Sequence, residues 1–277
     1  MYEVNFDISG QVAVITGAGG VICGTMAREM AKKGAKIALL DLFLESAQKI
    51  ADDINAAGGE AIAVKANVLD HASLEQAREE VVAKFGHIDI LINGAGGNKK
   101  EATVSPELDF FHLDTDAFKW VFDLNVTGAV LTTMVFGELL AKQGHGNVIN
   151  IASMATYHPL TNTVAYCGAK AAVANFTEWM ATHFNQNYSK DIRVNAIAPG
   201  FLLWPLNQIP CLSPEPISSA PLCASFAEGC EVAPAPQRGK SPPLRWPFPK
   251  SKGPADCGYW ERESPYSLPA LLGYISQ

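Results

Sequence analysis

Residues 12–41 read VAVITGAGGVICGTMAREMAKKGAKIALLD and decide the fold of this chain. The run VAVITG (12–17) has the continuous apolar character of a buried strand, and so does KIALLD (36–41). Between them a glycine-rich turn, TGAGGVICG (16–24), leads into a helix that we expect to end at about residue 33. In a strand–turn–helix–strand unit of this length, backbone amides at the start of the helix can approach a pyrophosphate. The stretch therefore predicts an α/β fold with a dinucleotide site.

The same alternation of strands and helices continues up to residue 200. Continuous apolar strands that are separated by helices indicate a parallel sheet covered on both faces. We therefore predict a doubly wound, Rossmann-like parallel sheet of six strands. The four further strands are expected at EAIAVKANV (60–68), IDILINGAG (88–96), NVINIAS (147–153) and IRVNAIAPG (192–200), and the further helices at 44–58, 73–86, 116–144 and 164–185.

After residue 200 the sequence changes in character. Fourteen of the 17 prolines lie there, and no segment keeps a period of 2 or 3.6. Proline removes a backbone donor and is excluded from helix interiors and central strands. We therefore divide the chain into a dinucleotide-binding and catalytic Rossmann domain, residues 1–200, and an atypical proline-rich tail, residues 201–277, which we expect to be irregular or extended.

Composition excludes several classes of protein. A net charge of −7 argues against nucleic acid as the main partner, because phosphate contacts need a basic surface. The start of the chain lacks the pattern of a signal peptide, and no run approaches 18 uninterrupted apolar residues, so we expect no membrane partner and a cytoplasmic location. Six cysteines without a CxxC pair, and six histidines without metal-ligand spacing, favour neither a disulfide scaffold nor a metal site.

Candidate cofactor residues lie where the predicted strands end. A carboxylate at Asp41 can accept hydrogen bonds from both adenosine ribose hydroxyls and would repel a 2′-phosphate, which favours NAD over NADP; the alternative is that Asp41 caps the next helix. The amide of Asn67 can meet the adenine edge, the NGAGG loop (93–97) faces the nicotinamide, and Pro199–Gly200 closes it off. The candidates are Gly17, Gly19, Gly20, Val21, Ile22, Asp41, Asn67, Val68, Asn93, Ala95, Gly96, Pro199 and Gly200.

Three residues suggest a reaction. Tyr166 and Lys170 are four positions apart in a predicted helix, so both project from one face. An ammonium beside a phenol favours the phenolate, so Tyr166 can exchange a proton near neutral pH. Ser153 follows a predicted strand, and its hydroxyl would emerge at the carboxyl edge of the sheet, where open α/β sheets bind ligands. Alone, the spacing is more typical of a solvated lysine beside a half-buried tyrosine. The three residues together predict protonation of an alkoxide or deprotonation of an alcohol.

These motifs, in this order, resemble the short-chain dehydrogenase/reductase family over residues 6–200. The resemblance implies that Tyr166 is the catalytic acid/base and that Ser153 orients the substrate carbonyl. It further implies that Lys170 promotes loss of the Tyr166 proton and holds the nicotinamide ribose, that Tyr166 and Lys170 contact the cofactor, and that Asn125 supports a water-mediated proton relay. The turn departs from the family pattern TGxxxGxG, because Val21 and Cys23 stand at the two later glycine positions. We expect binding to survive with altered geometry.

A subgroup resemblance indicates the substrate. The glycine-rich turn, NGAGGN, FDLN and the SMxxxxPLT segment resemble reductases of sugar acids, the D-mannonate oxidoreductase and fructuronate reductase-like subgroup. The polar insertion at residues 98–115 borders the expected substrate pocket, and Lys99 or Lys100 can pair with a substrate carboxylate or be a solvated loop lysine. The resemblance thus implies a small-molecule substrate such as mannonate or fructuronate.

Two alternatives follow from the tail. The helical segment and last strand that the family places after the sixth strand are absent from residues 201–277, which either a changed reading frame near residue 201 or genuine divergence would explain. Without that substrate lid, the protein could bind nucleotide with no turnover. A reductase of acyl or steroid ketones is the other alternative. The resemblance also implies a homo-oligomer, a dimer or tetramer formed through helices 116–142 and 164–184.

Overall fold

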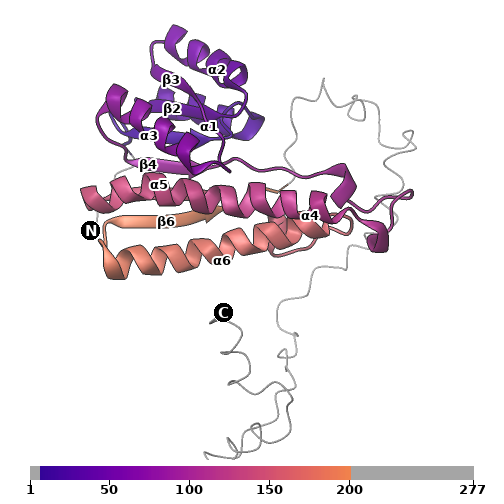
Figure 1. Cartoon of the computed structure of the whole chain (residues 1–277). Coiled ribbons are helices and arrows are strands. Elements are labelled where there is room, and N and C mark those ends of the chain that lie inside the picture. Colours follow the sequence, from indigo (N-terminus) through magenta and orange to yellow (C-terminus); the bar gives the residue numbers. More distant parts are fainter. Residues whose placement is uncertain (1–6, 201–277) are drawn as a thin grey trace, which may run out of the picture. The chain divides into compact units, whose positions relative to one another are not determined.

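The computed structural model describes residues 7–200, and these form a parallel α/β sheet with helices on both faces (Figure 1). Every strand pairs with its neighbours in parallel, in the spatial order β3-β2-β1-β4-β5-β6, which confirms the predicted doubly wound sheet of six strands. The strands are β1 (Val12–Thr16), β2 (Lys36–Asp41), β3 (Glu60–Lys65), β4 (Ile90–Asn93), β5 (Gly146–Ile151) and β6 (Ile192–Ile197).

The helices alternate with these strands. Those of the main layers are α1 (Val21–Lys32), α2 (Leu44–Ala56), α3 (His71–Phe85), α4 (Thr115–Phe122), α5 (Gly128–Gln143) and α6 (Val164–Asn187). The short 3₁₀ turns are η1 (Lys100–Ala102), η2 (Phe110–His112) and η4 (Met154–Thr156). Glycines end several helices as the sequence predicts: Gly58 follows α2 with φ +85° and Gly86 follows α3 with φ +83°, a left-handed conformation that glycine adopts without strain.

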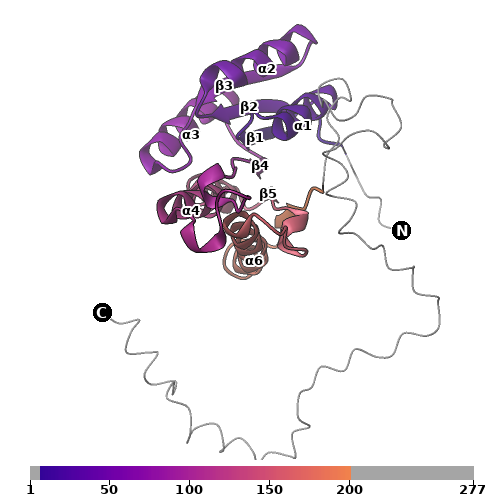
Figure 2. The same cartoon turned by 90° about the vertical axis from the view of Figure 1, so that its right-hand side faces the viewer.

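Two apolar cores hold the layers together. Helices α1 and α2 pack on one face of the sheet, against Ile15 and Ile37 among others. Helices α3, α5 and α6 pack on the other face, where Phe136 and Leu140 of α5 are fully buried. Figure 2 shows α1 and α3 on opposite sides of the strands. Burial on both faces explains why β1 is wholly apolar up to Thr16, because a parallel strand between two helical layers exposes no side chain.

The strand order places a crevice at one point of the sheet. The chain winds from β1 towards β3 in one direction and from β4 towards β6 in the other, so connections diverge between β1 and β4. Ligands of open α/β sheets bind outside the carboxyl ends of the strands at such a switch point. The turn after β1 and the loop after β4 therefore face each other across the expected site.

The helix predicted over residues 116–144 contains a π-helical turn, η3 (Asp123–Thr127), between α4 and α5. Such a turn inserts one residue into the helix and is often found at functional sites. The predicted third to sixth strands also end earlier than expected, at Lys65, Asn93, Ile151 and Ile197, because the residues that follow form loops at the carboxyl edge of the sheet.

The span Thr115–Gln143 is long and apolar enough to cross a membrane by length and composition, with a mean hydropathy of 1.5. Half of this window is buried in the fold, where Phe136 and Leu140 contact the sheet. Packing in the core accounts for its apolar composition. The expectations for residues 201–277, including an irregular tail, lie outside the described residues.

Candidate functional site

A cavity of about 690 Å³ opens at the carboxyl ends of β1, β2 and β4. This volume lies within the range of small-molecule and cofactor sites, roughly 300–1,000 Å³. Ten of the candidate cofactor residues line it, and they are Gly17, Gly19, Gly20, Val21, Ile22, Asp41, Asn67, Val68, Ala95 and Gly96. The turn after β1 and the loops after β2, β3 and β4 thus form one pocket.

The glycine-rich turn leaves no room for side chains. Gly17 has φ +62°, and a Cβ atom added there would lie 2.8 Å from the Cα atom of Ala95. A Cβ at Gly19 would lie 2.6 Å from the Cβ of Ser46. The amides of Ala18, Gly19 and Gly20 are hydrogen-bonded within the site, whereas the first amides of α1, from Val21 on, have no intrahelical acceptor and are the donors that a ligand at the start of α1 can reach. This is the cradle that a pyrophosphate fits.

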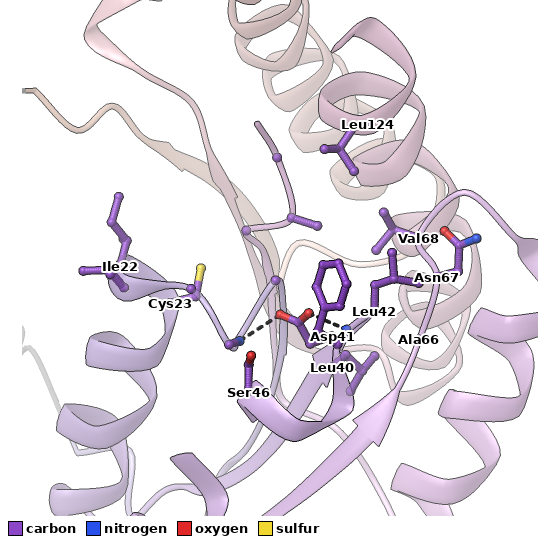
Figure 3. A pocket seen from close by; sticks show the side chains of 18 of the residues that line it. Ile22, Cys23, Leu40, Asp41, Leu42, Ser46, Ala66, Asn67, Val68 and Leu124 are labelled. Carbon is purple, nitrogen blue, oxygen red and sulfur yellow. Dashed lines mark hydrogen bonds between the residues drawn. The ribbon is translucent and has the colours of Figure 1, made fainter. Parts of the chain in front are cut away.

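Asp41 sits at the centre of the pocket (Figure 3). Its Oδ2 accepts a hydrogen bond from the backbone N–H of Gly19 at 2.9 Å, and its Oδ1 accepts one from Phe43 at 2.9 Å. Helix α2 has Phe43 as its N-cap residue, so Asp41 is not the helix cap that the alternative interpretation required. Each carboxylate oxygen can accept a further hydrogen bond, so both remain available to ribose hydroxyls.

Several pocket residues were not predicted. Leu42 and Phe43 are 50% and 70% exposed and line the cavity directly after Asp41, and Trp120 and Leu124 reach it from α4 and the π-helical turn. The sequence offers a signal for Leu42 and Phe43, because they are two large apolar residues that follow directly after a strand and lie outside the helical period of α2. Nothing local marks Trp120. The other unpredicted lining residues are Cys23, Leu40, Ser46, Ala66 and Gly94.

Cys23 and Gly94 fit each other across the switch point. The Cys23 side chain is 4% exposed and occupies the space beside Gly94, where an added Cβ atom would collide with its Sγ. The same Cβ would lie 2.8 Å from the carbonyl oxygen of Thr16. Burial raises the pKa of the Cys23 thiol to about 11, so the group stays protonated and acts through its size. The cysteine in the turn is therefore compensated by a glycine in the loop after β4.

Lys170 and Asn125 converge on Gly96. A Cβ added at Gly96 would lie 2.6 Å from Asn125 Oδ1 and 3.3 Å from Lys170 Nζ. Gly96 also lines the cofactor cavity, so both side chains lie directly behind its wall. Lys170 Nζ is 5.6 Å from the centroid of the Tyr166 ring, as expected for two residues four positions apart on one face of α6. The structure thus brings Lys170 and Asn125 together beside Gly96, with Tyr166 next to Lys170.

Lys170 is an almost fully buried cation, 5% exposed. Its ammonium donates a hydrogen bond to the carbonyl oxygen of Ile151 at 2.7 Å. Burial lowers the pKa of Lys170 to about 8, because the interior solvates a charge less well than water. The group is therefore protonated at neutral pH and loses its charge as the pH rises through about 8.

The side chain of Asn125 is fully engaged in structure. Its Nδ2 donates to the carbonyl oxygens of Gly97 and Val121, both at 2.7 Å, and its Oδ1 accepts from the Gly97 amide at 3.3 Å. These bonds clamp the loop after β4 to the π-helical turn. An asparagine inside a regular helix is destabilising because its side chain competes for backbone hydrogen bonds. Here the side-chain amide bonds backbone groups of Val121 and of the loop after β4, which offsets that cost.

Ser153 ends the segment after β5 and caps the turn η4, where its Oγ accepts the Ala155 amide at 3.1 Å. Its hydroxyl proton can still be donated to a ligand. The Met154 amide donates to the carbonyl oxygen of Pro199 at 3.0 Å, so the end of β6 braces this turn. Tyr166 is half-buried at the start of α6. Ser153 itself is 7% exposed.

Five cofactor candidates do not line the cavity: Tyr166 and Lys170, which are described above, and Asn93, Pro199 and Gly200. Asn93 is buried beneath the loop, where its Nδ2 donates to Thr133 Oγ1 at 2.9 Å and Asn150 Oδ1 at 2.8 Å. It supports the loop from below. Pro199 and Gly200 lie beside Met154, whose Sδ would be 3.8 Å from a Cβ at Gly200. The structure places them at the Ser153 turn.

Comparisons with known proteins agree with this geometry. A family model described as short chain dehydrogenase matches residues 11–208. An uncharacterized oxidoreductase of Bacillus subtilis (strain 168) named UxuB is 46% identical over 211 residues, which are 73% of this chain and 75% of the relative. D-threitol dehydrogenase of Mycolicibacterium smegmatis is 32% identical over 201 residues, 73% of this chain and 74% of the relative.

A crystal structure with bound NAD has the same fold. Its protein, from Haemophilus influenza, is provisionally named D-mannonate oxidoreductase. It is 45% identical, and the superposition covers 74% of this chain and 76% of that chain with a TM-score of 0.67. The described glycine cradle and Asp41 fit the dinucleotide that this structure holds.

Proposed function

The chain belongs to the short-chain dehydrogenase/reductase family and is an NAD-dependent oxidoreductase, and from this premise we propose that it interconverts the secondary alcohol and the ketone of a sugar acid such as mannonate or fructuronate. The observation that carries the proposal is the convergence of Lys170 and Asn125 on Gly96, behind the wall of the dinucleotide pocket. The sugar acid is supported by the provisional name of the NAD-bound relative.

The proposed mechanism assigns one task to each side chain. Bound NAD supplies or accepts the hydride. Tyr166 gives its phenolic proton to the substrate oxygen in reduction and takes it back in oxidation. Lys170, charged below about pH 8, stabilises the phenolate that remains, and the Ser153 hydroxyl donates a hydrogen bond to the same substrate oxygen. The Asn125 side chain uses both of its N–H donors to hold the loop after β4 and the end of α4, so in a proton relay it can only accept a hydrogen bond or position the loop.

The substrate proposal is tested by turnover. We expect NADH oxidation with a hexuronate that carries a ketone, and a kcat/KM roughly tenfold or more above that for the uncharged ketose of the same carbon skeleton, since a charged contact contributes about 1.5–3 kcal/mol. A preference for steroid ketones or acyl thioesters would contradict the sugar-acid assignment. NADH binding without turnover of any ketone would instead support the nucleotide-binding alternative.

The choice of NAD is proposed to rest on Asp41. Asp41→Asn should weaken NAD binding by roughly tenfold, because it removes a charged acceptor for the ribose hydroxyls and weakens the bonds that the carboxylate accepts from Gly19 and Phe43. We also expect only a small gain in NADP binding, since no arginine or lysine lines the described pocket to pair with a 2′-phosphate. Calorimetric titration of both nucleotides measures this. Unchanged NAD affinity would show that Asp41 does not bind the ribose.

We further propose that the protein assembles through the helix pair α5–α6. Met134 and Trp179 are 59% and 57% exposed and line one groove between these helices, which is an unusual amount of exposed apolar surface. Trp179→Glu should therefore reduce the mass measured by light scattering to that of the monomer. A wild-type mass of one chain would contradict the proposal.

A further inference from the structure

Lys99 differs from the other described lysines. Among residues 7–200 only Lys36, Lys99 and Lys170 are not exposed. Lys36 forms an ion pair with Glu60 at 3.3 Å, and Lys170 donates to a backbone carbonyl in the catalytic group. Lys99 has no carboxylate within 4.0 Å among the described residues. A partly buried ammonium with no carboxylate at ion-pair distance is a candidate site for an anion.

The Lys99 ammonium lies over an aromatic ring at the border of two sites. Its Nζ is 4.5 Å from the centroid of Trp120. Trp120 lines the cofactor cavity, and it also packs against the apolar cluster of Val121, Ala165 and Ala169, which Tyr166 joins. A cation over an indole face is held in place, but its charge is not neutralised. The charge therefore lies on a ring that borders the cofactor pocket and packs against the same cluster as Tyr166.

The loop that carries Lys99 is fixed at several points. The carbonyl oxygen of Lys99 accepts a hydrogen bond from Thr103 Oγ1 at 2.8 Å, and the Asn98 side chain donates to the same hydroxyl at 2.9 Å. Ala102 is fully buried in the cluster under Trp120, and Val104 donates to the carbonyl oxygen of Asn162 at 2.9 Å. In Figure 1 this segment, which follows β4, reaches the end of the helix pair where α4 begins. The backbone from which Lys99 projects is thus fixed, and Trp120 is the contact of its ammonium.

The nearby carboxylate of Asp114 is already in use. Its Oδ1 accepts the amides of Asp116 and Ala117, both at 2.8 Å, and so caps α4. Asp114 is too far from Lys99 to form an ion pair. Its negative charge reduces the positive potential around Lys99, but the ammonium keeps its donors free for a ligand. Lys100, the next residue, is exposed at the start of η1 and has neither an aromatic platform nor a described partner. The two lysines that the sequence leaves equivalent are therefore in different environments.

We propose that Lys99 binds the carboxylate of the substrate, so that the insertion at residues 98–115 selects ketones and alcohols that carry an acid group. The proposal rests on the proposed function and specifies which residue recognises the acid. A fixed cation beside the helix of Tyr166 pairs with a carboxylate while the ketone of the same small molecule reaches the tyrosine. An uncharged ketose gains nothing from this contact.

The test compares Lys99→Met with the matched control Lys100→Met in the full-length enzyme. Both variants, and the wild type, are assayed with a keto-hexuronate and with the ketose that has a hydroxymethyl group in place of its carboxylate. Lys99→Met should raise KM for the hexuronate roughly tenfold to hundredfold with little change in kcat, and should leave the KM values for the ketose and NADH unchanged. Lys100→Met should change none of these values, and Lys99→Arg should restore part of the affinity.

Each other outcome has a defined meaning. Equal losses on both substrates in Lys99→Met would show that Lys99 only supports Trp120, and no loss would show that it is solvated; either result overturns the proposal. If the wild type reduces no hexuronate, the proposed function fails first. Other keto acids and their uncharged counterparts are then compared as substrates of the wild type. If the wild type shows no preference for the acids, the proposed role of Lys99 is overturned as well.

Discussion

Tyr166→Phe is expected to lower kcat by about 10²–10⁴-fold while NADH still binds, because positioned acid–base groups typically contribute that much to the rate. Phenylalanine keeps the ring that packs with Ala165 and Ala169 and lies 5.6 Å from the Lys170 ammonium, so the pocket should stay intact. Only the transferable proton is lost. Steady-state turnover together with NADH titration by fluorescence measures the two effects separately.

Tyr188→Phe is the matched control for this variant. Tyr188 follows the other end of α6 and is 57% exposed. Its ring contacts the rings of His183 and Phe184, and its amide donates to the Phe184 carbonyl oxygen, so its hydroxyl should be dispensable. Its kcat should equal that of the wild type. If Tyr166→Phe retained wild-type turnover with NADH bound, Tyr166 would not be the acid/base, whatever the substrate.

Gly94→Ala is expected to have the second largest effect, on both stability and cofactor binding. The new Cβ would collide with Cys23 Sγ and lie 2.8 Å from the carbonyl oxygen of Thr16, so the turn and the loop after β4 must move apart. Overpacking of this kind costs about 1–3 kcal/mol in the free energy of unfolding. We expect a lower Tm and NAD affinity weakened by roughly tenfold. Thermal melts with and without NAD report both.

A second substitution separates the two clashes. Cys23→Gly in the Gly94→Ala background removes the contact with sulfur but keeps the contact with Thr16, so it should restore Tm and affinity only in part. Gly97→Ala, in the same loop, is the control, since its Cβ would meet no atom closer than 3.6 Å. Cys23→Gly alone completes the cycle, and a double variant whose loss of stability equals the sum of the two single losses would mean that Cys23 and Gly94 are independent.

The fold was predictable because each of its elements has a local signal. Strand β1 is apolar throughout, and helices α2 and α3 stop at glycines, so neither needs a distant contact to be recognised. The glycine turn and Asp41 were predictable for the same reason, since both belong to one unit of about thirty residues.

The remainder of the site depends on contacts between distant residues. Cys23 looks like a defect in the glycine pattern until Gly94, 71 positions later, is seen to provide the space it fills. Trp120 enters the pocket from a helix whose sequence resembles any amphipathic helix. Lys99 and Lys100 are chemically identical neighbours, and only the position of Trp120 distinguishes them. Local patterns carry no information on such pairings.

The π-helical turn has a consequence for how this family member can change. In an α-helix each residue advances by about 100°, so one residue inserted at Asp123–Thr127 rotates everything beyond it by that angle. Val121 therefore points to α6, while Val135 and Phe136 point to the sheet, along what is otherwise one rod. Insertions and deletions are usually tolerated in loops. Here, deletion of a single residue would rotate α5 relative to α4 by about 100°, so either Val121 would lose its contact with α6 or Phe136 would lose its contact with the sheet. The chain is constrained in length at this point as strictly as it is in residue type.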